Sequence, residues 1–176
     1  MVGSELLMAS EGRPSTKAKV VSTGDAGIFR VAVIGSGVMG AGIAAQCANA
    51  GCDVLLLDVV PEEAVDRDCL ARIAKEKMHK SDPEMLMKRS FADRITPGNL
   101  EDDLHLIEDY DWVIEVVIED LGVKRSLYSR IAEHLGPKTI LSSNTSTLPR
   151  SSLTDGMPIG VASRFLITHF FNLSLI

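Results

Sequence analysis

Residues 30–58 read RVAVIGSGVMGAGIAAQCANAGCDVLLLD, and this stretch decides the fold. An apolar run at 31–34 leads into a glycine-rich segment at 35–40. Small residues follow, and a second apolar run closes at Asp58. The pattern predicts a strand, a tight turn, a helix, a second strand and an acidic residue at its end. This order of elements is typical of a site that binds a dinucleotide.

Each glycine of the loop has a separate role in such a site. Gly35 makes the tight turn after the strand, and Gly37 lets the backbone approach a pyrophosphate because it has no Cβ. Gly40 allows the helix to pack closely on the sheet. The free N–H groups and the positive dipole end of the helix then face the phosphates. The predicted cofactor loop consists of Gly35, Ser36, Gly37, Val38, Met39 and Gly40. The simpler alternative is a glycine-rich turn without a ligand.

Asp58 indicates which dinucleotide binds. It follows Gly35 by 23 residues, close to the spacing of about 20 expected for the acid that binds the ribose. Its carboxylate would accept hydrogen bonds from the ribose hydroxyls and repel a 2′-phosphate. Residues 59–61 are Val-Val-Pro and offer no arginine to hold that phosphate. The sequence therefore favours NAD over NADP. Asp58 could also be an ordinary residue at a strand end.

Composition excludes several classes of protein. The 176 residues suffice for one domain with a hydrophobic core, and the net charge of −6 makes nucleic acid an unexpected partner. Three cysteines without metal-binding spacing predict no metal site and a reducing compartment. No apolar run approaches the roughly 18 residues of a membrane span. We therefore expect a cytoplasmic protein without membrane contact. Residues 1–28 are expected to form a mobile leader, and 29–176 the domain.

The remaining chain alternates between strand and helix patterns. Helices are expected at 61–80, 84–90, around 100–107 and at 121–135. Strands are expected at 94–96, 112–117, 139–143 and 165–171, with a turn at 97–99. This alternation predicts an α/β fold with a doubly wound parallel sheet of the Rossmann type. The charged helices after Asp58 are either a solvated face or a basic arm that meets a phosphorylated substrate.

Three polar clusters follow strands, and ligands of open α/β sheets bind outside the carboxyl ends of the strands. The first is Glu119 with Lys124, the second is 144–146, and the third is His169 with Asn172. Each has an ordinary alternative: a surface ion pair, a helix cap or turn, and a core histidine. Together they predict hydride transfer, in which a histidine removes a hydroxyl proton. His169 is the histidine placed for that role, and a hydroxyl such as Ser146 could bind the carbonyl oxygen that forms.

Four motifs in order carry a family resemblance: GSGVMGAGIA, DWVIEVVIEDLGVK, SSNTSTL and RFLITHFFN. They resemble the NAD-binding domain of the 3-hydroxyacyl-CoA dehydrogenases of fatty-acid β-oxidation. The resemblance implies oxidation of (3S)-3-hydroxyacyl-CoA to 3-ketoacyl-CoA with NAD. It implies that His169 is the catalytic base and that Ser146 contacts substrate and nicotinamide. The implied cofactor contacts are Glu119, Lys124, Ser146 and Asn172. Because the charged arm contacts CoA in the family, Lys75 and Lys77 are candidates for substrate binding.

Two departures from the family pattern limit the expected activity. Leu173 stands where the family has proline, and the glutamate that orients the family's histidine lies beyond position 176. The helical domain that closes over the substrate and forms the family's dimer would also follow there. We expect these 176 residues to bind NAD with little dehydrogenase activity, since a histidine without its orienting carboxylate loses tautomer control.

Two other functions stay open from the sequence. The chain could be a non-catalytic NAD-binding or interaction module, whose apolar end at 170–176 seeks a partner. It could also be a related dehydrogenase that acts on a polyol phosphate or a hydroxy acid.

Overall fold

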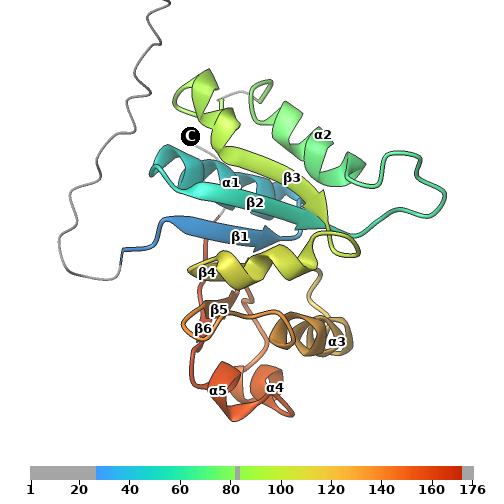
Figure 1. The fold of residues 1–176 in the computed structure, drawn as a ribbon, viewed down its shortest axis with the longest axis vertical. Coiled ribbons are helices and arrows are strands. Elements are labelled where there is room, and N and C mark those ends of the chain that lie inside the picture. Colours follow the sequence, from blue (N-terminus) through green and yellow to red (C-terminus); the bar gives the residue numbers. More distant parts are fainter. Residues whose placement is uncertain (1–26, 82–83, 172–176) are drawn as a thin grey trace, which may run out of the picture.

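The structure is a computed structural model, and it describes residues 27–81 and 84–171. Most of the predicted leader lies outside these ranges, as do Asn172 and Leu173. The described chain forms a single sheet of six strands with helices on both faces (Figure 1).

The sheet is parallel throughout, with the order β3-β2-β1-β4-β5-β6. Its strands are β1 Arg30–Ile34, β2 Asp53–Asp58, β3 Ile95–Asn99, β4 Trp112–Glu115, β5 Ile140–Ser143 and β6 Phe165–Ile167. This order confirms the predicted doubly wound fold of the Rossmann type. The order reverses between β1 and β4, and the crevice at such a reversal is where these folds bind nucleotides.

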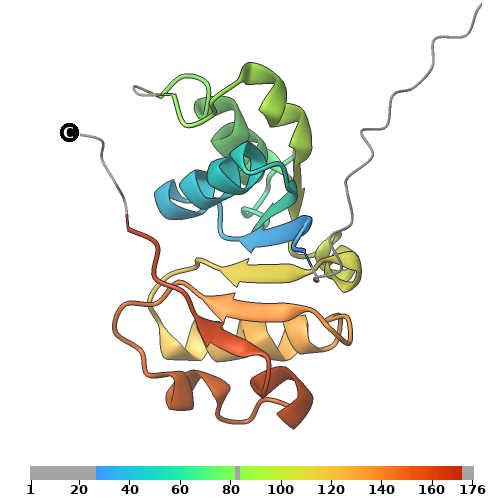
Figure 2. The same ribbon diagram turned by 90° about the vertical axis from the view of Figure 1, so that its left-hand side faces the viewer.

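The helices pack in two groups (Figures 1 and 2). The α-helices are α1 Val38–Asn49, α2 Cys69–Lys77, α3 Leu121–Ala132, α4 Arg150–Thr154 and α5 Ile159–Ala162. Two 3₁₀ helices, η1 Arg89–Arg94 and η2 Leu104–Asp109, precede β3 and β4. Figure 2 shows α1 and α2 beside β1–β3, and α3–α5 beside β4–β6. None of the helices within the described ranges is both long and apolar enough to cross a bilayer.

Alternation along the strands builds two cores, one on each face of the sheet. Val31 and Val33 of β1 face α1 and α2, whereas Ala32 and Ile34 face η2 and α3. All four side chains are buried, as expected for a parallel strand that is covered on both faces. The inner face of α1 is built from small residues, which lets the helix approach the sheet closely: Ala41, Ala44, Ala45 and Ala48.

The predicted helix at 61–80 is wrong in its first half, because α2 begins only at Cys69. Glu63 adopts a left-handed backbone with φ of 56°, which a continuous helix does not allow. Two side chains then tie the segment to the end of β3. Arg67 pairs with Asp102 at 2.6 Å, and Asp68 accepts a hydrogen bond from Asn99. These contacts hold the segment before α2 in turns.

The segment 84–99 also differs from its prediction. The expected helix at 84–90 is wrong for residues 84–88, which form no helix, and the 3₁₀ helix η1 begins only at Arg89. Asn49 of α1 holds this stretch through bonds to the Met85 carbonyl and the Met87 amide. The expected turn at 97–99 is instead the second half of β3. Pro97 fits there because β3 is the edge strand, where no further strand needs its missing N–H. The other expected elements exist, with ends that differ by a few residues.

Candidate functional site

Two glycines of the loop after β1 are required by the protein itself. Gly35 has φ of +105°, a conformation that other residues rarely adopt, and a Cβ there would lie 2.6 Å from the Val116 carbonyl oxygen. A Cβ on Gly40 would lie 1.7 Å from the Gly35 carbonyl oxygen. The turn is fixed by the Gly35 amide, which donates to the Leu57 carbonyl at 2.8 Å. The loop therefore connects the ends of three neighbouring strands, β2, β1 and β4.

Gly37 differs, because a Cβ there would meet no described atom within 4 Å. Its φ of −60° is accessible to any residue. The fold therefore does not require glycine at this position, whereas a ligand that approaches the backbone would. Gly37 is the N-cap of α1, and no side chain caps that helix by a hydrogen bond in the described structure. Val38 beside it is largely exposed, so the start of the helix is accessible to a ligand.

Asp58 at the end of β2 lies against the glycine loop. Its Oδ2 accepts hydrogen bonds from the Ser36 amide at 2.6 Å and from the Ser36 hydroxyl at 2.5 Å. Its Oδ1 accepts from the Val59 amide at 2.7 Å. The structure thus brings the predicted ribose acid and the predicted pyrophosphate loop into direct contact. Carboxylate lone pairs that these donors leave free are available to ribose hydroxyls.

Glu119, which follows β4, organises the loop after β5. Its Oε1 accepts hydrogen bonds from the Thr145 hydroxyl, from the Ser146 and Thr147 amides at 3.2 Å each, and from the Thr147 hydroxyl at 2.9 Å. Partial burial raises the pKa of Glu119, but these bonds and the charge of Lys124 outweigh it and lower the pKa to about 2. Glu119 is therefore ionised at neutral pH and fixes the backbone at Ser146, whose side chain is exposed.

Lys124 lies behind this loop rather than on its surface. Its side chain is fully buried, and its Nζ lies 2.6 Å from Glu115 Oε1 and 3.4 Å from Glu119 Oε2. Sequence reasoning missed Glu115, which is the last residue of β4 and is also fully buried. The available signal was an acidic residue inside the apolar run WVIEVV, since a buried charge needs a partner.

His169 follows β6 and is held beside the end of β5 through both of its neighbours. The Thr168 amide donates to the Ser143 carbonyl at 3.0 Å, and the Phe170 amide donates to Asn144 Oδ1 at 2.8 Å. The imidazole itself is exposed and packs on Phe171, with ring centroids 4.4 Å apart. His169 and Ser146 are therefore both attached to the segment that leaves β5.

The two candidate substrate lysines lie elsewhere. The Lys75 amino group donates to the carbonyl of Ile95, the first residue of β3, at 2.6 Å. The start of β3 is at the edge of the sheet opposite to the glycine loop. Lys77 is exposed at the end of α2. The structure therefore does not join either lysine to the other predicted residues, and Asn172 is outside the described ranges.

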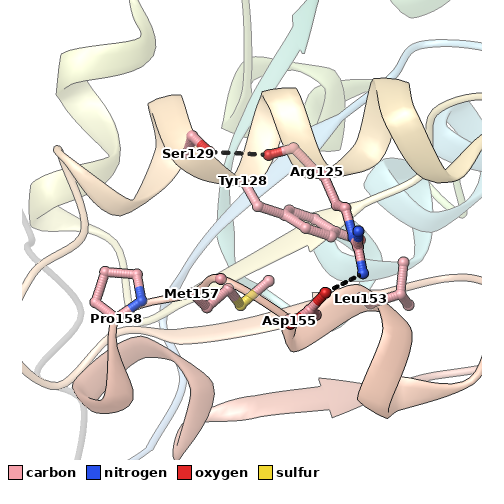
Figure 3. A pocket seen from close by; sticks show the side chains of 8 residues that line it. Arg125, Tyr128, Ser129, Leu153, Asp155, Met157 and Pro158 are labelled. Atoms are coloured by element: carbon pink, nitrogen blue, oxygen red, sulfur yellow. Dashed lines mark hydrogen bonds and ion pairs between the residues drawn. The ribbon is translucent and has the colours of Figure 1, made fainter.

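A small pocket lies between α3 and the segment 153–158, away from the glycine loop (Figure 3). Arg125, one of its lining residues, pairs with Asp155 at 2.8 Å. None of the predicted site residues lines it. Within the described ranges, no group of three or more His, Cys, Asp or Glu side chains is arranged to hold a metal ion.

Comparison with known proteins identifies the family. Residues 30–174 match the family model described as 3-hydroxyacyl-CoA dehydrogenase, NAD binding domain. The chain belongs to this family. The match confirms the predicted resemblance, and the family's domain confirms NAD as the cofactor. The matched residues include all six strands of the sheet.

Relatives agree with this assignment. The chain is 49% identical over 148 residues to a putative fatty acid oxidation complex trifunctional enzyme of Rickettsia felis, with 82% of the chain and 20% of that protein covered. It is 44% identical to a probable 3-hydroxyacyl-CoA dehydrogenase of Deinococcus radiodurans, over 82% of the chain and 42% of that protein. The crystal structure of 3-hydroxybutyryl-CoA dehydrogenase from Escherichia coli K12 superposes with a TM-score of 0.68 at 31% identity. The alignment covers 84% of this chain and 30% of that one. The chain thus spans less than half the length of these relatives.

Proposed function

We propose that this chain supplies the NAD-binding and proton-accepting half of a 3-hydroxyacyl-CoA dehydrogenase. The observation that carries the proposal is the attachment of His169 and Ser146 to the segment that leaves β5. That segment lies at the same edge of the sheet as the glycine loop and Asp58. The substrate class follows from the names of the relatives, which are 3-hydroxyacyl-CoA dehydrogenases and a fatty acid oxidation enzyme.

The residues take roles that fit their positions. Residues 35–40 bind the pyrophosphate, and Asp58 accepts hydrogen bonds from the ribose. When bound, NAD supplies the acceptor for the hydride that leaves the hydroxyl-bearing carbon. The exposed imidazole of His169 takes the hydroxyl proton, and the Ser146 hydroxyl donates to the oxygen that becomes the carbonyl. Glu119 holds Ser146 in place. Asn172 as a cofactor contact, and Lys75 and Lys77 as substrate contacts, remain predictions from the resemblance.

The domain bounds, the cellular location, the substrate and the assembly are proposed from the same family membership. We propose that residues 29–176 form the NAD-binding domain and that it functions in the cytoplasm. An acyl-CoA is the proposed substrate, and the active assembly is proposed to be a dimer that uses a helical domain of the full enzyme. Neither nucleic acid nor a membrane is a proposed partner, which is consistent with the net charge of −6.

Binding and turnover test different parts of the proposal. Calorimetry on the 176-residue polypeptide should show NADH binding, with NADPH weaker because of Asp58. Reduction of acetoacetyl-CoA, followed by loss of NADH absorbance, should be much slower than in a full-length family member. His169→Gln should abolish any turnover and leave NADH affinity nearly unchanged. Absence of NADH binding by folded protein would contradict the assignment, and turnover as fast as in the full-length enzyme would contradict the expected dependence on the second domain.

A non-catalytic interaction module is the second candidate, and one observation favours it. β6 is the second edge strand of the described sheet, opposite β3, and its residues Leu166 and Ile167 are exposed by 49% and 39%. An apolar edge strand invites association. Sedimentation at increasing protein concentration tests this, because a protein that stays monomeric would count against association through β6. A screen of acyl-CoA, polyol phosphate and hydroxy acid substrates in the full-length enzyme separates the remaining dehydrogenase alternatives.

A further inference from the structure

The end of β4 carries a buried charged residue that none of the predicted roles includes. Glu115 pairs in register with Ile34 of β1 on one side and with Ser143 of β5 on the other. It therefore lies at the point where the strand order reverses, directly below the edge that carries the glycine loop. Its side chain is fully buried.

Four donors surround the Glu115 carboxylate. Oε1 accepts from Lys124 Nζ at 2.6 Å and from the Val117 amide at 2.7 Å. Oε2 accepts from the Tyr128 hydroxyl at 2.5 Å and from the Ser143 hydroxyl at 2.7 Å. The donors come from α3, from the connection between β4 and α3, and from β5. One carboxylate thus fixes the three segments that meet at the predicted cofactor rim.

The contacts continue from Glu115 to the rim itself. Lys124 bridges Glu115 to Glu119, and Glu119 holds residues 145–147 by four hydrogen bonds. In addition, the Asn144 amide donates to the Glu115 backbone carbonyl at 2.8 Å. The described structure gives Lys124 two carboxylate partners within 4 Å, and the nearer one is Glu115. Without the Glu115 charge, the buried ammonium would depend on Glu119 alone and would draw that carboxylate away from Thr145 and Thr147.

We propose that Glu115 is a positioning residue of the cofactor site, which acts through Lys124 to hold Glu119 and the loop after β5. This inference rests on the proposed function of that edge as the NAD site. Glu115 itself touches no cofactor. Its charge is the feature that matters, because it balances the buried Lys124 and leaves Glu119 free to accept hydrogen bonds from the loop.

Glu115→Gln tests the charge with little change in shape. The amide can keep most of the hydrogen bonds, since the Tyr128 and Ser143 hydroxyls can rotate to accept. Tyr128→Phe is the matched control, because it removes one donor to the same carboxylate and keeps the charge. Both variants should lower Tm. Only Glu115→Gln should raise the Kd for NADH, by about tenfold or more, and Tyr128→Phe should change it by less than about threefold.

A double-mutant cycle with Lys124→Gln tests whether the effect of Glu115 passes through Lys124. If Glu115 acts through Lys124, the double variant should bind NADH within about threefold of Lys124→Gln alone. The double variant also serves if Glu115→Gln does not fold alone, because it leaves no unbalanced buried charge. A Glu115→Gln variant with lowered Tm and unchanged Kd would overturn the proposal. A further tenfold loss in the double variant would overturn it too. Wild-type protein that folds but binds no NADH would instead contradict the proposed function.

Discussion

Ser36 donates two hydrogen bonds to a single carboxylate oxygen of Asp58, one from its amide and one from its hydroxyl. The contact joins the glycine loop to the end of β2 and fixes the orientation of the carboxylate. The other oxygen, Oδ1, has one described donor, the Val59 amide. Since a carboxylate oxygen can accept two hydrogen bonds, Oδ1 can also bind a ribose hydroxyl. In the proposed cofactor site, Ser36 would thereby orient Asp58 toward the ribose.

Asp58→Asn should reduce discrimination between the two cofactors. The amide oxygen can still accept from Ser36, but the charge that repels a 2′-phosphate is lost. We expect the ratio of NADPH to NADH affinity to rise by about tenfold, measured by calorimetry. Asp53→Asn, at the opposite end of β2, is the control and should leave the ratio unchanged. An equal ratio in wild type and Asp58→Asn would show that Asp58 does not discriminate between a ribose with a free 2′-hydroxyl and one with a 2′-phosphate.

Gly37→Val and Gly40→Ala should separate binding from folding within one loop. A side chain at Gly37 meets no described atom within 4 Å, so Tm should change little while NADH affinity falls by about tenfold or more. A Cβ at Gly40 collides with the Gly35 carbonyl, so that variant should lose about 1–3 kcal/mol or more in urea unfolding. Unchanged NADH affinity in Gly37→Val would remove the basis of the cofactor site.

Glu119 should contribute to the acid sensitivity of the fold. Its pKa in the native state is about 2, below the ordinary value of 4.5, so in this range the unfolded chain binds more protons than the native one. Its contribution to stability is present above pH 4.5 and is lost as the pH falls toward 2. Glu119→Gln should therefore lose less stability than wild type between pH 5 and 3. Because the side chain is 36% exposed, we expect a difference of about 1 kcal/mol.

Urea unfolding at several pH values measures this difference. The control is Glu133→Gln, at the end of α3, which should follow the wild-type profile. A Glu119→Gln profile parallel to that of wild type would mean that the bonds from Thr145 and Thr147 do not persist in solution.

The sequence predicted the sheet better than the segments between its strands. The run 31–34 and the glycine spacing specify β1, the turn and α1 because burial on both faces and close packing leave few alternatives. The predicted start of the helix that became α2 was wrong, because no local sequence pattern reveals the left-handed backbone of Glu63. Pro97 and Gly98 resemble a turn locally, and only their place on an edge strand makes them part of β3.

In the candidate site, too, local patterns predicted some residues, whereas others depend on tertiary packing. Glu119, Ser146 and His169 were predicted as site residues because each follows a strand, and parallel strands bring their carboxyl ends to one edge. The burial of Lys124 was not predictable in this way. Its partner Glu115 precedes it by nine residues, and only the packing of α3 on β4 brings the two together. Motif spacing predicts which side chains lie at the carboxyl edge of the sheet. The buried residues that pair with them, such as Glu115, depend on tertiary packing.

Asn144→Ala should loosen the segment that carries His169. The variant removes the acceptor of the Phe170 amide, and a lost hydrogen bond of this kind costs about 1 kcal/mol. We expect faster hydrogen exchange at residues 168–171, followed by mass spectrometry, with little change in NADH affinity.

Thr168→Val is the control for Asn144→Ala, because it loses the 3.2 Å contact with the Ser142 hydroxyl but keeps the backbone bond to Ser143. Exchange in that variant should stay close to wild type. In a full-length enzyme that carries these residues, Asn144→Ala should lower kcat more than it changes the KM for NADH, because it misplaces His169, the proposed proton acceptor, and leaves the glycine loop intact. Unchanged exchange at Phe170 in Asn144→Ala would show that the position of His169 is set by other contacts.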